Sequence, residues 1–327
     1  MNRILFQVVS CSSMAAAALL FTVSHSVAQS YPQKPVRMVL PMSPGGGADT
    51  LARIIVPEVA EVLGEPIVLD NRPGASGIIA SEIVARSAPD GYTLLMGSSI
   101  VMTFAKSLYK LSFDPIKDFA PIIQLGTSQF ILVVNPSVPA KTVSELIALA
   151  KAKPRSLNYA SGGIASPLHL AAELFKGRAG IDMVHVAYKG GSPAAASVVA
   201  GETQVLFASF ASSLRFVETG RLRALAVTGL KRSMLKPELP TMDESGFPGF
   251  NVTLWSSFEA PAGTPRNIIE RLHDDTIRVL RRPGVSERVN KIGYTPTGTS
   301  PEQLAEIKRT ESAVWAKVIK DASIQAK

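Results

Sequence analysis

The chain has 327 residues, of which 46% are hydrophobic and 18% are charged, and its formal net charge is +8 at neutral pH. These proportions allow large buried cores and exclude an intrinsically disordered protein. The lysines and arginines are scattered, with no basic run longer than a pair such as Arg281-Arg282, so nucleic-acid binding is not indicated. A positive charge of this kind suits small organic anions, although a solvated basic surface explains it equally well.

The first 28 residues have the pattern of an export signal. Arg3 provides a positive start, residues 14–23 form an apolar core, and Ser26-Val-Ala28 provides small residues before a cleavage expected after Ala28. The core is too short for a transmembrane anchor, which needs about 20 apolar residues. The only cysteine, Cys11, lies in this segment. We therefore predict a signal peptide at 1–28 and a disulfide-free mature protein in a bacterial periplasm.

A glycine-rich stretch is the first candidate binding element. It reads Pro41-Met-Ser-Pro-Gly-Gly-Gly-Ala-Asp-Thr50 and lies between an expected strand at 36–40 and a helical pattern that ends near Gly64. Such a turn directs backbone N–H groups and the positive end of the helix dipole at an anion. It matches neither nucleotide-binding fingerprint, and a plain tight turn is the alternative. Pro57, inside the helical pattern, predicts a kink or an early end of the helix.

A second turn of the same kind occurs at 161–166, after an expected strand at 157–160. In Ser161-Gly-Gly-Ile-Ala-Ser166, Ser166 is a good N-cap, and Pro167 suits the first helical position. The helix that follows again begins at a small, flexible turn. This recurrence favours anion binding over a plain turn at both places.

The other segments alternate between expected strands and helices. Further strands are expected at 66–69, 92–96, 120–125, 130–134, 183–187, 203–208, 222–228 and 251–259. Further helices are expected at 78–86, from Thr142 to Pro154, at 193–200, between the strands at 203–208 and 222–228, from Thr264-Pro265 to about 282, and from Ser300 onward. In the last helix, the residues expected to face inward are Leu304, Ile307, Val314, Trp315 and Val318. The alternation predicts an α/β protein with mainly parallel sheets.

Sequence motifs of enzymes and metal sites are missing. His169, His185 and His273 are far apart and form no metal-binding pattern, and no Gly-x-Ser-x-Gly elbow occurs. His169 is either an anion donor in the first turn of its helix or a histidine packed on the sheet, and Tyr188 is either a site wall or an ordinary aromatic. Glycine amides and hydroxyl groups remain, without an evident base or nucleophile. We therefore predict recognition rather than catalysis, with no metal and no cofactor.

Short motifs span nearly the whole mature chain. They are Tyr31-Pro-Gln-Lys-Pro-Val36, Pro44-Gly-Gly-Gly-Ala-Asp49, Asn71-Arg-Pro-Gly-Ala-Ser-Gly77, Asp90-Gly-Tyr-Thr93, Tyr188-Lys-Gly190, Leu225-Ala-Val-Thr228, Pro240-Thr241 with Glu244-x-Gly246, and Ala260-Pro-Ala-Gly-Thr-Pro265. With these motifs in this order, the chain resembles the Bug/TctC family of periplasmic solute receptors, which serve tripartite tricarboxylate transporters. Each motif alone is weak, but the set is specific.

The resemblance implies a two-lobed periplasmic-binding-protein fold of the type II kind, in which each lobe is a mainly parallel sheet flanked by helices and the ligand lies between the lobes. We expect the first lobe at 29–129 and 259–327 and the second at 130–258. Family members hold a ligand carboxylate between the first-lobe loop and the second-lobe turn. The resemblance therefore implies ligand-binding roles in the loop for Met42, Ser43, Gly46, Gly47 and Asp49, in the turn for Ser161, Gly163 and Ser166, and along the first-lobe wall for Ala75, Ser76 and Ser98. His169 and Tyr188 complete the candidate set from the second lobe.

The chain departs from the family pattern at two positions. Many members carry an aromatic residue where Met42 stands, which makes this side of the site more adaptable. Members that bind amino acids tend to have an aspartate after the turn at Gly201, whereas Gln204 and Ala208 occupy the expected sites here. We therefore include Gln204 in the site and predict a mono- or dicarboxylate ligand without an ammonium group.

The resemblance also implies a mechanism and partners. A carboxylate docks on one lobe, the lobes close around it by a hinge motion, and a monomeric receptor delivers it to a membrane permease. One alternative is a sensor subunit that reports its bound state to a signalling partner. Another is an exported hydrolase that uses Ser161 or Ser166, for which no histidine–carboxylate partner is evident in the sequence.

Overall fold

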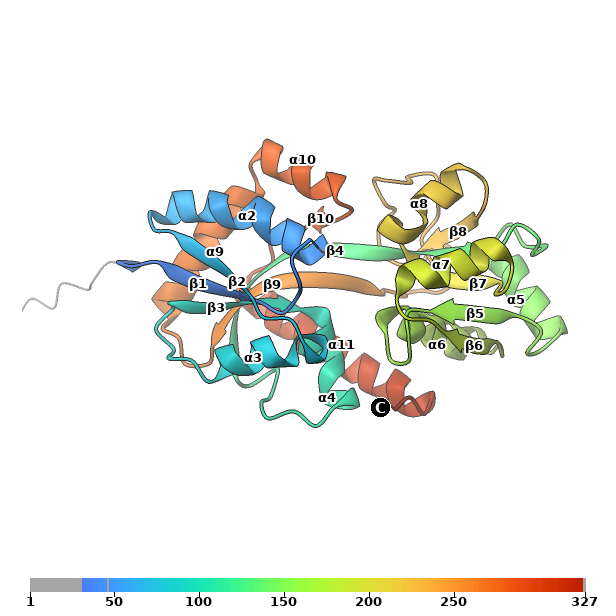
Figure 1. Ribbon diagram of the computed structural model, residues 1–327, viewed down its shortest axis with the longest axis horizontal. Coiled ribbons are helices and arrows are strands. Elements are labelled where there is room, and N and C mark those ends of the chain that lie inside the picture. Colours follow the sequence, from blue (N-terminus) through green and yellow to red (C-terminus); the bar gives the residue numbers. More distant parts are fainter. Residues whose placement is uncertain (1–30, 46, 326–327) are drawn as a thin grey trace, which may run out of the picture. The chain divides into compact units, whose positions relative to one another are not determined.

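The computed structural model describes residues 31–45 and 47–325. The predicted signal peptide and Gly46 therefore lie outside the described residues. The chain divides into an N-terminal unit that ends at Gln33 and a main unit, Lys34–Lys327, to which all the described helices and strands belong (Figure 1). None of the helices in the described part combines the length and the apolar character needed to cross a membrane.

The first part of the sheet is parallel, as the alternation of strands and helices predicts. Strand β1 (Val36–Leu40) pairs in parallel with β2 (Ile67–Asn71) and with β3 (Thr93–Ser98). Helices α2 (Gly47–Leu63) and α3 (Ile78–Ala85) connect these strands. Helix α2 continues through Pro57, so the expected early end does not occur.

Two long antiparallel strands form the middle of the sheet. Strand β4 (Phe119–Val134) is one 16-residue strand where the sequence predicts two short ones, and its residues 119–129 pair with β9 (Thr253–Pro261). Its last residues, 130–134, pair with β7 (Val205–Ser209) and β8 (Arg223–Val227). Strand β9 also pairs antiparallel with β3. β4 therefore runs from one region of the sheet into the other (Figure 1).

The second region returns to parallel pairing. Strand β5 (Asn158–Ser161) lies between β6 (Val184–Ala187) and β7, parallel to both. The helices of this region are α5 (Val143–Ala152), α6 (Pro167–Ala179), α7 (Gly191–Ala200) and α8 (Phe210–Glu218). Because α6, α7 and α8 follow β5, β6 and β7, their N-termini lie at the carboxyl edge of this part of the sheet.

The C-terminal segment holds helices α9 (Arg266–Leu280), α10 (Pro283–Lys291) and α11 (Pro301–Asp321), with the two-residue strand β10 (Thr295–Pro296) pairing with β4. Helix α10 is not predicted from the sequence, where Pro283 marks only the end of α9. In α11, Leu304 packs in a core cluster with β1 and β3, whereas Trp315 and Ile319 pack in the cluster that contains β5 and β7. Val314 is 40% exposed, contrary to its expected inward position. Because α11 contributes to both clusters, the lobe boundaries at 129/130 and 258/259 stay a prediction.

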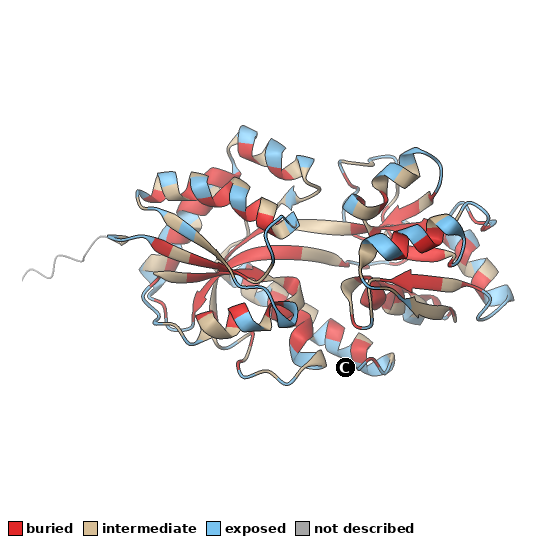
Figure 2. Ribbon diagram, in the orientation of Figure 1, coloured by how far each residue is buried: buried red, intermediate tan, exposed pale blue. Residues whose placement is uncertain are grey.

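Buried residues concentrate on the strands and on the inward faces of the helices (Figure 2). Strands β4 and β9 are nearly continuous buried runs in their central and final parts, as expected for strands with elements on both faces. Inside this core, Lys308 and Glu259 form an ion pair with an Nζ–Oε2 distance of 3.0 Å and side chains 2% and 0% exposed. The core of the described residues therefore contains a fully buried charge pair.

Candidate functional site

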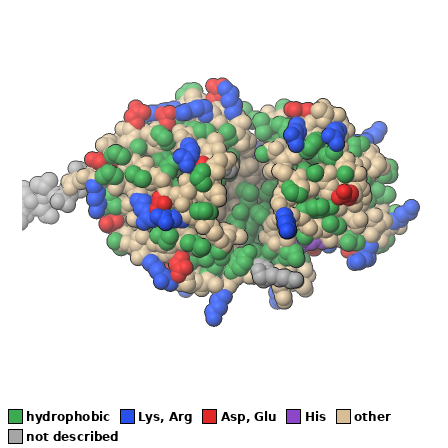
Figure 3. Space-filling model, in the orientation of Figure 1, with side chains coloured by type: hydrophobic (Ala, Val, Ile, Leu, Met, Phe, Trp, Pro, Cys, Tyr) green, Lys and Arg blue, Asp and Glu red, His purple; other side chains and the backbone are tan. Residues whose placement is uncertain are grey.

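A cavity of about 700 Å³ lies where the two regions of the sheet meet. Its lining comes from the start of α2, the end of β3 and the segment 99–109 that follows it, the middle of β4, the start of β9, the starts of α6 and α8, and the loop before β10. In Figure 3 the hollow between these elements is lined largely by hydrophobic side chains. Elements that are far apart in the sequence thus share one cavity.

Met42 and Gly47 line the cavity from the glycine-rich loop, together with Pro41 and Ala48. Gly47 faces Tyr294, because a Cβ atom at Gly47 would lie in van der Waals contact with that ring, at 3.5 Å. Ser43, also expected in the site, is exposed and is not among the lining residues. The loop therefore contributes its two ends to the cavity wall, while nothing is described for Gly46.

Asp49 does not line the cavity but holds the loop from within. Its carboxylate accepts hydrogen bonds from the Gly45 amide at 2.9 Å, from Arg53 Nε at 2.8 Å and from Asn71 Nδ2 at 2.9 Å. Asn71 Nδ2 also donates to the carbonyl of Met42 at 2.9 Å. The Arg53 hydrogen bond, with the amide and Asn71, lowers the pKa of Asp49 to about 2 although burial opposes this. Asp49 therefore holds the loop in this structure, and its ligand contact stays a prediction.

The first-region wall continues through Ser76 and Ser98, both of which line the cavity as predicted. Ala75 is exposed, and it does not line the cavity. The loop approaches closely at Gly77, where φ is +95° and a Cβ atom would come within 2.9 Å of Pro41 and Val101. A glycine at this position is what allows the loop to approach Pro41 and Val101 this closely.

The start of α6 lines the cavity from the other side. Ser166 is the N-cap, with its side chain accepting from the His169 amide at 3.3 Å, and Pro167 follows at the first helical position. Gly162, Ile164 and Ala165 line the cavity beside them. Ser161 and Gly163 lie behind this surface, because Ser161 is fully buried and its hydroxyl accepts from the Gly163 amide at 3.1 Å. Only Ser166 of the three predicted turn residues thus lines the cavity.

The cavity is also lined by a helix start that the sequence pattern does not single out. Ser209 is the N-cap of α8, with its side chain accepting from the Ser212 amide at 3.3 Å, and Ser209, Phe210 and Ala211 all line the cavity. The signal in the sequence is a serine that ends a buried strand. No glycine accompanies it, which is why it resembles an ordinary strand-to-helix connection.

Three other predicted residues do not line the cavity, and their side chains bond to neighbouring groups of the protein. His169 is 6% exposed, and its Nδ1 accepts from the Ala165 amide at 3.0 Å. Tyr188 contacts Glu202, with an oxygen–oxygen distance of 3.4 Å. The Gln204 side chain accepts from the Asn158 amide at 2.9 Å and donates to the Gly201 carbonyl at 3.2 Å. For His169 the sheet-packed alternative is the observed one.

Aromatic side chains from the last third of the chain form a further part of the wall. Trp255 on β9 and Tyr294 before β10 both line the cavity, and Tyr294 hydrogen-bonds to Ser256. Trp255 Nε1 donates to Glu311 Oε2 at 2.8 Å, and burial raises the pKa of Glu311 to about 7. The sequence predicts the strand around Trp255 but gives no sign that it faces a ligand cavity.

The cavity carries hydroxyls and aromatic rings but no charged side chain among its lining residues. Helix starts provide the positive potential, because the amides of a first turn have no partner within their helix. Helices α6 and α8 have no acidic residue in their first turn, whereas α2 has Asp49. The site can therefore hold an anion by amides and hydroxyls. No group of three or more His, Cys, Asp or Glu residues that could hold a metal occurs in the part of the chain that is described.

One serine–histidine contact bears on the hydrolase alternative. Ser161 Oγ lies 2.7 Å from His185 Nε2, a pairing that the sequence did not reveal. However, Ser161 is fully buried, does not line the cavity, and its hydroxyl also bonds the backbone of Gly163 at 3.0 and 3.1 Å. A nucleophile must reach its substrate, so this serine is placed as a structural group.

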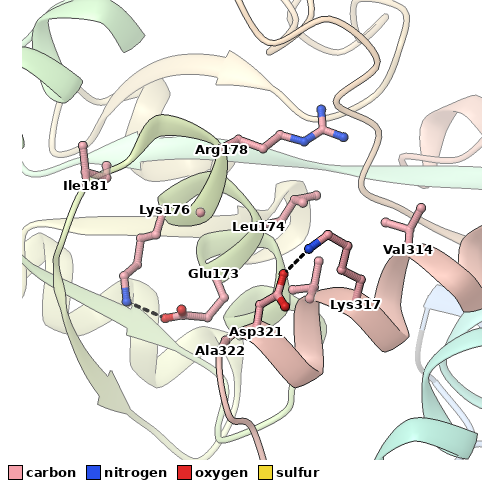
Figure 4. A pocket seen from close by; sticks show the side chains of 11 residues that line it. Glu173, Leu174, Lys176, Arg178, Ile181, Val314, Lys317, Asp321 and Ala322 are labelled. Atoms are coloured by element: carbon pink, nitrogen blue, oxygen red, sulfur yellow. Dashed lines mark hydrogen bonds and ion pairs between the residues drawn. The ribbon is translucent and has the colours of Figure 1, made fainter.

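A second hollow of about 530 Å³ lies between α6 and the end of α11 (Figure 4). Its charged side chains are already paired, Lys176 with Glu173 at 2.8 Å and Lys317 with Asp321 at 2.5 Å. Arg178 donates to the Pro248 carbonyl at 3.3 Å. These pairs leave the second hollow less suited to an anion than the cavity at the helix starts.

Comparisons with known proteins agree with the fold. The protein-family model TctC, described as tripartite tricarboxylate transporter family receptor, matches residues 51–324. BugT of Bordetella pertussis is 33% identical over 316 residues, which cover 96% of each chain. The structure of Rpa4515 of R. palustris with adipate is 34% identical with a TM-score of 0.74 and covers 90% of this chain and 99% of that one. MatC of Rhodopseudomonas palustris with bound malate is 31% identical with a TM-score of 0.70 and covers 88% and 100%.

These likenesses extend over nearly the full length of each protein, and they confirm the α/β periplasmic-binding-protein fold that the sequence motifs imply. The resemblance noted in the motifs is therefore confirmed as well. The chain belongs to the Bug/TctC family of tripartite tricarboxylate transporter receptors.

Proposed function

We propose that this protein is a periplasmic receptor, exported by a signal peptide cleaved after about Ala28. In this proposal it captures a small carboxylate and delivers it to the membrane permease of a tripartite transporter. The observation that carries the proposal is one cavity into which three helix starts and several serine hydroxyls face, with no charged side chain in the lining. Backbone amides and hydroxyls at helix starts suit a carboxylate. The relatives solved with adipate and malate support the same ligand class.

The ligand is a mono- or dicarboxylate without an ammonium group. An ammonium needs a carboxylate or several acceptors in the wall, and no Asp or Glu lines the cavity. The hydrocarbon part of the ligand faces Met42, Trp255 and Tyr294. A calorimetric panel of adipate, malate, benzoate, aspartate and glutamate tests this. We expect at least one of the first three acids to bind and neither amino acid to bind. The reverse pattern would refute the ligand class.

Capture proceeds by hinge closure. The cavity has walls from both regions of the sheet. Strand β4 connects these regions, because it pairs with β9 in one and with β7 in the other. A carboxylate bound on one wall favours closure if the other wall adds contacts only in the closed state. Small-angle scattering should show a monomer that becomes more compact when the ligand is added. An unchanged radius of gyration at saturation would contradict closure.

Ser166 provides a sharper test because the chain offers a matched control. Ser300 also caps a helix and is also followed by proline, with its side chain accepting from the Gln303 amide at 3.2 Å, but it does not line the cavity. Ser166→Ala and Ser300→Ala should each lose about 1 kcal/mol of stability through the missing cap. Only Ser166→Ala should also weaken carboxylate binding, by about five- to thirtyfold, through the missing hydroxyl donor. Equal affinity in the two variants would refute the site.

The sensor alternative differs only in the partner. Deleting the gene should abolish uptake of the bound carboxylate if the protein serves a permease. If uptake persists and a transcriptional response is lost instead, the signalling role replaces the transport role.

A further inference from the structure

Three stacked rings lie behind the turn at 161–166. The rings of His169 on α6 and His185 on β6 are 3.9 Å apart at an interplanar angle of 9°, and the ring of Tyr159 on β5 lies 4.8 Å from that of His185 at 17°. Tyr159 and His169 are buried, and His185 is partly exposed. None of the three lines the cavity, so these rings can affect ligand binding only through the turn.

Each histidine holds one end of the turn by a side-chain hydrogen bond. His185 Nε2 lies 2.7 Å from Ser161 Oγ, which in turn accepts from the Gly163 amide. His169 Nδ1 accepts from the Ala165 amide at 3.0 Å. Ala165 has φ of +60°, a conformation that a residue other than glycine keeps only when its surroundings hold it. The residue after Ala165 is Ser166, the N-cap that lines the cavity.

The hydrogen bond to Ala165 fixes the protonation of His169. An N–H group donates to Nδ1, so this nitrogen carries no proton and the proton of the neutral ring is on Nε2. The charged groups facing the ring are Glu173, at 3.9 Å from Nε2, and Lys176, which is paired with Glu173 (Figure 4). Burial, His185 and Lys176 outweigh Glu173 and lower the pKa of His169 to about 4. The ring is therefore neutral near pH 7, as the contact requires.

We propose that His169 and His185 are positioning residues, which hold the turn 161–166 from behind so that Ser166 and the first amides of α6 face the ligand carboxylate. The inference rests on the proposed function for its ligand, but the contacts that carry it are present without a ligand. The stack makes the pair rigid, and rigid support is what keeps a binding turn in productive geometry.

Two substitutions at His169 separate positioning from simple packing. His169→Asn keeps an acceptor near the place of Nδ1, whereas His169→Phe keeps the ring and its stacking but removes the acceptor. In the ligand-free protein, hydrogen exchange at the Ala165 amide, followed by NMR, should be slow in wild type and in His169→Asn and about tenfold faster in His169→Phe. His273→Asn, on α9, is the matched control and should change nothing at Ala165. Equal exchange in the Asn and Phe variants would overturn the proposal.

The ligand arm uses calorimetry with adipate, malate and benzoate. We expect the probe that binds wild type to lose about tenfold in affinity in His169→Phe and to regain most of it in His169→Asn. Equal affinities in the two variants would overturn the positioning role. If wild type binds none of the probes, the proposed ligand class fails, while exchange at Ala165 still decides the positioning role. If His169→Phe does not fold, His185→Gln and His185→Phe give the same comparison at the Gly163 amide.

Discussion

Replacing Asp49 by asparagine tests whether the glycine-rich loop is held by its own carboxylate. Asp49 is 1% exposed and accepts from Gly45, Arg53 and Asn71. These partners lower its pKa from 3.8 to about 2, and at about 1.4 kcal/mol per pKa unit the shift corresponds to about 2 kcal/mol of folding stability. Arg53 is 50% exposed, so solvent screens part of this and the loss in Asp49→Asn should be about 1–2 kcal/mol.

The pH dependence gives the sign of the effect. The pKa of Asp49 is lower in the folded protein than in the unfolded chain, so its contribution is complete above about pH 5 and is lost as the pH falls toward 2. Urea unfolding of wild type and Asp49→Asn at pH 7 and pH 3 measures this, and the difference should shrink at the lower pH. Asp321→Asn, which breaks an exposed pair with Lys317, should cost less than about 0.5 kcal/mol. A difference for Asp49→Asn that is absent at pH 7, or equal at both pH values, would refute the role of the charge.

Two further predictions concern buried charges. Lys308→Met leaves Glu259 buried without its partner and should lower the free energy of unfolding by about 3–5 kcal/mol, and an unchanged urea midpoint would contradict this. Because the pKa of Glu311 is raised to about 7, its ionisation should cost stability as the pH rises from about 4.5 through 7, where the unfolded chain is already ionised. Trp255, whose Nε1 donates to this carboxyl, should report the same titration in its fluorescence, with a midpoint near pH 7 that Glu311→Gln abolishes. A fluorescence signal that still titrates in the Gln variant would show that another group is responsible.

Two of the three helix starts at the site, those of α2 and α6, could be predicted because their signals are local. Ser166 followed by Pro167 specifies a capped helix from four or five residues of sequence, and the observed cap is the predicted one. Glycines before α2 likewise mark a close approach of the backbone. Such positions need no knowledge of the rest of the fold.

The direction of individual side chains could not be predicted in the same way. Asp49 and Gln204 lie in candidate binding segments, yet their side chains bond to groups of their own region, and Asn71 and Asn158 supply partners that are distant in the sequence. Ser209 and Trp255 reach the cavity only because β7 and β9 pair with β4. That pairing joins residues more than 70 positions apart, and no local pattern encodes it.

Asp49 also bears on which wall receives the carboxylate. It places a negative charge in the first turn of α2, where it already uses the Gly45 amide and part of the favourable helix potential. Helices α6 and α8 have no such charge in their first turns, and their caps Ser166 and Ser209 both line the cavity. We therefore infer that a carboxylate of the ligand meets α6 and α8, while Met42, in the loop before α2, contacts the hydrocarbon part of the ligand. In a cavity whose lining has no cationic side chain, the anion should bind at a helix start whose first turn has no acidic residue.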